Sequence, residues 1–169
     1  TRKGDYMLKE ELNVIKQAIL NELEGYEFYK MAAKQTGTAG SAEAFLELAR
    51  EEKKHIDYLE ALFIKLKDGV EDEKAMAFSE MPPSPNIYKW DKLDKDLTSL
   101  AMSVFSIGIQ MEKDAVDFYK KAKESTKLEE ARELYDLLIK WEKVHLEQFT
   151  EQYEIYREDW WADQGFAPF

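Results

Sequence analysis

Residues 19–55 read ILNELEGYEFYKMAAKQTGTAGSAEAFLELAREEKKH, and residues 109–145 read IQMEKDAVDFYKKAKESTKLEEARELYDLLIKWEKVH. A shift of 90 residues aligns the two stretches without a gap, and 12 of the 37 positions are identical. Average amino-acid usage would give about two or three identities over such a length. We interpret the two stretches as copies of one supersecondary unit, produced by an internal duplication.

Each copy predicts a pair of antiparallel helices. Apolar residues recur at alternating intervals of three and four, the spacing of a helix face that packs in a left-handed bundle. The two helix pairs are expected over about residues 8–67 and 94–158. Ser41 is expected as an N-cap, and Thr126-Lys-Leu-Glu129 has the pattern of a capping box. Four such faces turned inward predict an all-α four-helix bundle.

A longer connection separates the two halves. Residues 68–93 contain three of the four prolines of the chain, and we expect them to form a crossover. Two short turns and one long crossover are typical of the ferritin-like arrangement. We therefore expect one domain over residues 1–169. Its aromatic tail, residues 159–169, is expected to cover an end of the bundle or to contact a partner; it contains Trp160, Trp161, Phe166 and Phe169.

Composition excludes several classes of protein. The chain has 169 residues and a formal net charge of −11, which disfavours a nucleic-acid partner because phosphates would be repelled. It has no cysteine, so disulfides, thiolate zinc sites and iron–sulfur clusters are excluded. The longest uncharged run, residues 97–111, is too short and too polar to span a bilayer. The N-terminal residues lack the apolar core of a signal peptide, so we expect a cytoplasmic protein without a membrane partner.

Six polar residues occupy positions that the apolar pattern assigns to the core. These are Glu22, Glu52, His55, Glu112, Glu142 and His145. A buried carboxylate without a partner costs several kcal/mol, so four of them need compensation. No Lys or Arg occupies these helix faces, whereas two divalent cations would balance four ionised glutamates and leave both histidines as neutral ligands.

The spacing predicts that the four glutamates meet in one layer of the bundle. Glu22 and Glu52 lie 15 residues on either side of Gly37, and Glu112 and Glu142 lie equally far from Lys127. Each Glu-x-x-His places its carboxylate and its imidazole on one helix face. One Glu from each of two helices and a Glu-x-x-His from each of the others form a dinuclear carboxylate site. Such ligands suit iron, and also manganese or zinc.

The six residues, together with the inner tyrosines Tyr29 and Tyr119, resemble the diiron domain of rubrerythrins in the ferritin-like superfamily. The resemblance covers about residues 15–156. It implies two iron ions per site. It also implies a role for each ligand: bridging carboxylates from Glu52 and Glu142, terminal carboxylates from Glu22 and Glu112, and one imidazole per ion from His55 and His145.

The sequence departs from that family in two ways. Rubrerythrins generally carry a rubredoxin domain with four cysteines, and this chain has none, so its electrons are expected from a separate, rubredoxin-type donor. Rubrerythrins also carry an extra glutamate where this chain has Ala115, which the first half matches with Gly25. These small residues either leave space for a small oxidant or allow close helix packing. The family further implies a homodimer.

The resulting hypothesis is a non-haem diiron oxidoreductase that reduces hydrogen peroxide or dioxygen with electrons from an external donor. One alternative is a ferroxidase or iron-storage protein, in which Fe(II) is the substrate. A second is a metal-stabilised binding module without turnover. Around the metals, Tyr26, Tyr29 and Tyr119 either donate hydrogen bonds to ligand carboxylates, carry an oxidising equivalent, or only pack in the core.

Overall fold

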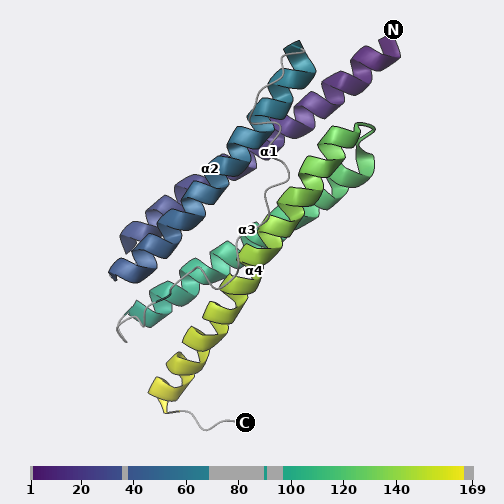
Figure 1. The fold of residues 1–169 in the computed structure, drawn as a ribbon. Coiled ribbons are helices and arrows are strands. Elements are labelled where there is room, and N and C mark those ends of the chain that lie inside the picture. The colour runs from purple at the N-terminus through teal and green to yellow at the C-terminus, as the bar shows by residue number, and fades with distance from the viewer. Residues whose placement is uncertain (1, 36–37, 69–89, 91–96, 166–169) are drawn as a thin grey trace.

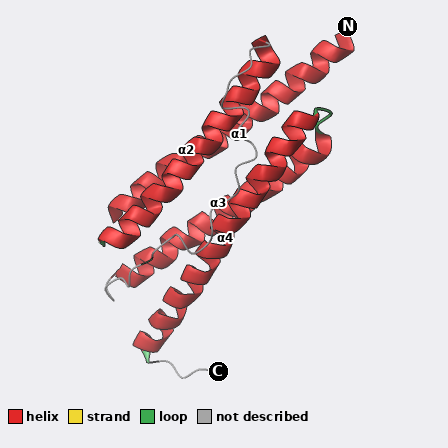
Figure 2. Cartoon of the chain, in the orientation of Figure 1, coloured by secondary structure: helices red, strands yellow, loops and turns green. Residues whose placement is uncertain are grey.

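The computed structural model describes residues 2–35, 38–68, 90 and 97–165. These residues form four α-helices, and no strand occurs in them (Figures 1 and 2). The helices are α1 (Arg2–Gln35), α2 (Ala39–Asp68), α3 (Thr98–Ser125) and α4 (Glu129–Gln164). The all-α prediction with two helix pairs is therefore confirmed. Most of the expected crossover, residues 68–93, lies outside the described residues.

Two helices are longer than the sequence pattern indicates. The first begins at Arg2 rather than near residue 8, and α4 continues through Trp160 and Trp161 to Gln164. Gly165 ends α4 in the left-handed conformation, with φ 69°, and its N–H donates to the carbonyl of Ala162. Glycine is the residue that adopts this conformation without steric cost. The first part of the expected tail is therefore helical, and Phe166 and Phe169 lie outside the described residues.

Both predicted helix caps are wrong. Ser41 lies inside α2, which already begins at Ala39, and the side chain is buried. The residue that caps α4 is Leu128, which makes no side-chain cap hydrogen bond. Thr126 instead serves the preceding turn, because its Oγ1 accepts a hydrogen bond from the N–H of Leu128 at 3.2 Å. Local side-chain bonds of this kind compete with capping.

Each helix packs against two neighbours. The pairs α1–α2 and α3–α4 are the closest, and α1 also contacts α3 while α2 contacts α4. In Figure 1 the two pairs lie side by side, and the beginning of α1 and the end of α4 lie at opposite ends of the bundle. Two apolar clusters fill the interior. One lies around Ile15, Leu59 and Leu138, and the other around Phe45 and Phe105.

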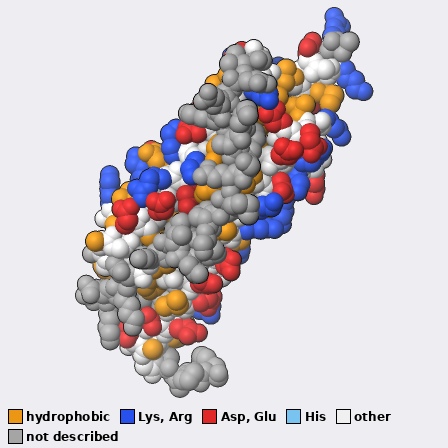
Figure 3. Space-filling model, in the orientation of Figure 1, with side chains coloured by type: hydrophobic (Ala, Val, Ile, Leu, Met, Phe, Trp, Pro, Cys, Tyr) orange, Lys and Arg blue, Asp and Glu red, His pale blue; other side chains and the backbone are white. Residues whose placement is uncertain are grey.

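The surface of the bundle is strongly charged. On the face drawn in Figure 3, acidic and basic side chains are interspersed, and hydrophobic side chains appear between them rather than as one continuous sheet. Among the described helices, none has an apolar stretch of the length needed to cross a bilayer. Both histidines of the chain are fully buried.

Candidate metal centre

All four helices contribute a carboxylate to one layer between the two apolar clusters. Glu22 comes from α1, Glu52 from α2, Glu112 from α3 and Glu142 from α4. Glu52 and Glu142 are each followed one turn later by a histidine, as the repeated Glu-x-x-His predicts. None of the six residues has more than 3% of its surface exposed. The structure thus brings together all six residues that the sequence placed in the core.

The six side chains form two overlapping groups. Glu22 and His55 belong to the first group, Glu112 and His145 belong to the second, and Glu52 and Glu142 belong to both. Within each group, one potential ligand atom from each of the four residues lies within 4.8 Å of the others. Two groups that share two carboxylates fit a dinuclear metal site with bridging carboxylates.

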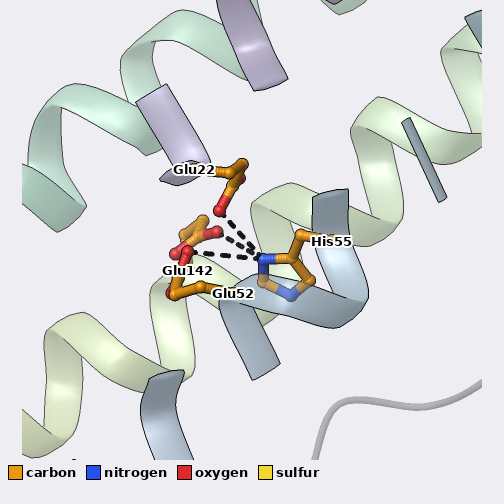
Figure 4. A group of neighbouring side chains, drawn as sticks. All are labelled: Glu22, Glu52, His55 and Glu142. Atoms are coloured by element: carbon orange, nitrogen blue, oxygen red, sulfur yellow. Dashed lines mark hydrogen bonds and ion pairs between the residues drawn. The ribbon is translucent and has the colours of Figure 1, made fainter. Parts of the chain in front are cut away.

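Both imidazoles turn the same nitrogen toward the carboxylates. In the first group, Nδ1 of His55 lies 3.3 Å from Glu22, 3.0 Å from Glu142 and 3.8 Å from Glu52 (Figure 4).

In the second group, Nδ1 of His145 lies 3.3 Å from Glu52 and 3.4 Å from both Glu112 and Glu142. A metal bound in each group would therefore meet Nδ1 of its histidine. The other nitrogen, Nε2, remains for contacts outside the centre.

Two tyrosines hold the carboxylates of α1 and α3. The hydroxyl of Tyr29 donates to Glu112, and the hydroxyl of Tyr119 donates to Glu22. Burial, followed by the charge of the accepting carboxylate, raises the pKa of both phenols well above the ordinary value, so both remain donors at neutral pH. The reciprocal contacts also show that α1 and α3 run antiparallel, since the later residue of one meets the earlier residue of the other.

The third tyrosine considered in the sequence has a different environment. Tyr26 is partly buried against the second apolar cluster, and Nζ of Lys30 lies 4.8 Å from the centre of its ring. It is not among the residues that line the cavity beside the carboxylates.

The pKa values of the buried glutamates are shifted because several acidic groups lie close together. Burial and the charge of Glu22 raise the pKa of Glu52 to about 8. Burial would also raise the pKa of Glu22, but the charge of His55 and the hydrogen bonds around it lower that pKa to about 2. Burial and the charge of Glu142 raise the pKa of Glu112. Without a cation the centre therefore retains protons that a metal would displace.

The residues present fit a pair of divalent cations. One oxygen each of Glu52, Glu112 and Glu142 is buried and accepts no hydrogen bond from the described residues. Among the described residues, no Lys or Arg belongs to either group or lines the adjoining cavity. Carboxylate oxygens and imidazole nitrogens are ligands for iron, manganese and zinc, so the ligand types do not select one of them.

A cavity of about 300 Å³ leads to the carboxylates between α1 and α3. Gly25 and Ala115 lie in its wall, at positions related by the 90-residue shift, and Glu24 and Asp114 line it as well. A Cβ at Gly25 would lie 3.4 Å from Oε2 of Glu52, so the glycine leaves room directly beside a carboxylate that both groups share. Gly25 and Ala115 were expected either to leave space for a small oxidant or to allow close helix packing. The cavity favours the first interpretation.

One residue of the centre was not identified from the sequence. Glu51 is 4% exposed, and its Oε2 lies 2.6 Å from Nε2 of His145. The equivalent position in the second half holds Trp141, whose ring meets His55 edge-on with 5.1 Å between ring centres. The sequence does contain a signal for Glu51. The two Glu-x-x-His motifs match, but the residue directly before them is a glutamate in the first half and a tryptophan in the second.

Comparisons with known proteins agree with this geometry. The family model described as rubrerythrin matches residues 13–153. A solved structure from Pyrococcus furiosus, described as a hypothetical protein, is 25% identical and superposes with a TM-score of 0.67. The match covers 88% of this chain and 90% of that one. No curated protein matches this chain.

Proposed function

This chain belongs to the rubrerythrin family, and we propose that it is a non-haem diiron oxidoreductase that reduces hydrogen peroxide or dioxygen with external electrons. The observation that carries the proposal is the pair of buried groups sharing Glu52 and Glu142. We assign these two as bridging carboxylates, Glu22 and Glu112 as terminal carboxylates, and His55 and His145 as one imidazole ligand for each ion.

The bound metal would supply the redox chemistry, because two Fe(II) ions together provide the two electrons that one hydrogen peroxide takes up on reduction to two waters. The protein's own residues provide position and exclusion. The four carboxylates would hold the two cations, and burial of all six ligands keeps bulk water away from most of the centre. Tyr29 and Tyr119 restrain the terminal carboxylates on α3 and α1.

The cavity between α1 and α3 supports a small substrate. Its volume of about 300 Å³ and its walls at Gly25 and Ala115 admit a molecule of a few atoms beside the carboxylates. Ala115 occupies the position at which rubrerythrins generally carry a further glutamate. In this chain, ligand exchange through such a glutamate is therefore not part of the proposal. The space next to the centre remains available to the oxidant.

The source of the electrons is part of the same proposal. Residues 1–169 contain no cysteine, so a rubredoxin-type iron site would lie outside them. We propose a separate electron donor of that type, and a homodimer in the cytoplasm.

A second candidate is a ferroxidase, in which Fe(II) is the substrate. The acidic side chains of Glu24 and Asp114 in the cavity favour it, since they would attract a cation toward the carboxylates.

The test is anaerobic loading with Fe(II), followed by stopped-flow spectroscopy with hydrogen peroxide and, separately, with dioxygen. We expect about two irons per chain and faster oxidation by peroxide. Faster oxidation by dioxygen with continued uptake of iron would favour the ferroxidase. Stoichiometric metal without oxidation faster than that of free iron would indicate a binding module, and failure to bind metal would overturn all three functions.

A further inference from the structure

The duplication places different residues next to the two histidines. Glu51 and Trp141 are related by the 90-residue shift, and each directly precedes a shared glutamate of the centre. Each also reaches across from its own helix to the histidine of the other half, Glu51 from α2 to His145 on α4 and Trp141 from α4 to His55 on α2. The two outer faces of the centre are therefore equivalent in position but not in chemistry.

His145 is held by a hydrogen bond as well as by packing. Its Nδ1 faces Glu52, Glu112 and Glu142, while its Nε2 lies 2.6 Å from Oε2 of Glu51.

A carboxylate accepts hydrogen bonds, so this contact favours the tautomer with its proton on Nε2 and the lone pair on Nδ1. That lone pair then points into the second group, where a cation would bind. The same contact fixes the rotation of the ring and makes Nδ1 a stronger metal ligand.

His55 lacks such support. Its Nδ1 also faces the carboxylates, but its Nε2 is buried and has no hydrogen-bond partner among the described residues. The neighbouring Trp141 meets the imidazole at an interplanar angle of 85°. An indole offers no acceptor lone pair to an imidazole N–H. Within the described part of the chain, the orientation of His55 thus depends on packing and on its carboxylate contacts.

We propose that Glu51 is a positioning residue that makes the two metal positions unequal. A divalent cation fills the position of His145, Glu112 and the shared carboxylates before it fills the position of His55 and Glu22. The inference rests on the proposed function, because it requires that both groups bind metal. Removal of a carboxylate that orients a metal-binding histidine typically weakens metal affinity about 10-fold to 100-fold, which sets the expected difference between the positions.

The experiment is a titration of the apoprotein with Co(II), the metal alone, followed by proton NMR. A histidine that binds Co(II) through Nδ1 gives a strongly shifted signal from its Nε2 proton, and this signal disappears in D2O. The Glu22→Ala variant assigns the signals, because it damages only the His55 position. In the unaltered protein we expect the His145 signal to appear with the first equivalent of Co(II), and the His55 signal to appear with the second.

Two variants then test the role of Glu51. Glu51→Ala removes the acceptor, and we expect the first binding step to weaken about 10-fold or more, so that both signals grow together. Glu51→Gln retains an acceptor oxygen without the charge, and we expect an intermediate effect. Glu60→Gln, an exposed glutamate of the same helix, is the matched control and should leave the order of filling unchanged. Helical circular dichroism of each apoprotein checks that it is folded.

The possible outcomes distinguish failure of this inference from failure of the proposed function on which it rests. If the unaltered protein binds no Co(II), the proposed metal centre itself fails. If it binds two Co(II) but both signals appear together, or if folded Glu51→Ala or Glu51→Gln retains the original order and affinity, the inference is overturned. A change in the Nε2 signal of His145 without a change at His55 distinguishes positioning from a general loss of stability.

Discussion

Glu52 and Glu22 occupy the same layer, yet their substitution should have different consequences. Glu52 contributes to both groups, whereas Glu22 contributes only to the first. We therefore expect Glu52→Ala to reduce bound metal from about two to well below one per chain, and Glu22→Ala to leave about one. Metal analysis after equilibrium dialysis gives the stoichiometry. Two metals retained in Glu52→Ala would contradict the assignment of this residue as a bridge.

The raised pKa of Glu52 predicts how the stability of the apoprotein depends on pH. An ordinary Glu has a pKa of 4.5, and in the folded protein the pKa of Glu52 is about 8, so the folded state holds a proton that the unfolded state releases. This bound proton stabilises the folded apoprotein fully below pH 4.5, and the stabilisation is lost as the pH rises to about 8. The raised pKa values of Glu112, His55 and His145 act in the same direction.

A metal reverses this dependence, because it replaces the protons as the compensating charge. We therefore expect the gain in Tm on addition of Co(II) to increase between about pH 4.5 and pH 8. Glu22 acts only at lower pH, because its lowered pKa of about 2 affects stability below pH 4.5. Thermal melts with and without metal across this range measure the effect, and a gain that shrinks with pH would contradict it.

At the scale of the helices, two glycines provide a matched pair of substitutions. A Cβ at Gly108 would lie 3.0 Å from the ring of Phe149, which is buried on α4 and packed against Phe105 and Tyr29. The ring has little room to move, so Gly108→Ala should destabilise the protein by about 1–3 kcal/mol, as overpacked cores do.

Gly25→Ala is the comparison. Its Cβ would meet Oε2 of Glu52 at 3.4 Å, which is an ordinary contact distance. Replacing a helical glycine by alanine gains about 0.5–1 kcal/mol, so we expect this variant to be at least as stable as the unaltered apoprotein. Urea denaturation of both variants gives the free energies of unfolding. Equal stability of the two variants would show that the ring of Phe149 can move away from residue 108 at little cost, which would contradict the prediction.

The helices also show which parts of the structure the sequence could predict. Periodicity and duplication were sufficient for four helices and for the layer of Glu22, Glu52, Glu112 and Glu142, because both depend on regular spacing along the chain. The caps depend on single hydrogen bonds, and Thr126 uses its hydroxyl in the turn instead. Glu51 was missed because its partner lies on α4, and no local pattern indicates which residue of another helix a side chain will reach.

The whole molecule depends on the centre to join its halves. Each metal group takes residues from both helix pairs, since Glu142 of α4 joins Glu22, Glu52 and His55 in the first group. In the second group, Glu52 of α2 joins three residues of the other pair. A bound cation would therefore connect α1–α2 with α3–α4, and without it protons must compensate the buried carboxylates at that interface.

We accordingly expect a chelator to lower the Tm and metal addition to restore it. Metal present at 100 times its dissociation constant stabilises a folded protein by about 2.7 kcal/mol, which for a chain of this size corresponds to roughly 5–10 °C.

Amide hydrogen exchange should show where stability is lost. We expect the faces of α1 toward α3 and of α2 toward α4 to exchange faster without metal, with a smaller change where α1 packs on α2. Uniform acceleration throughout the helices would mean that the pairs do not separate independently, and an unchanged Tm would mean that the centre contributes nothing to holding them together.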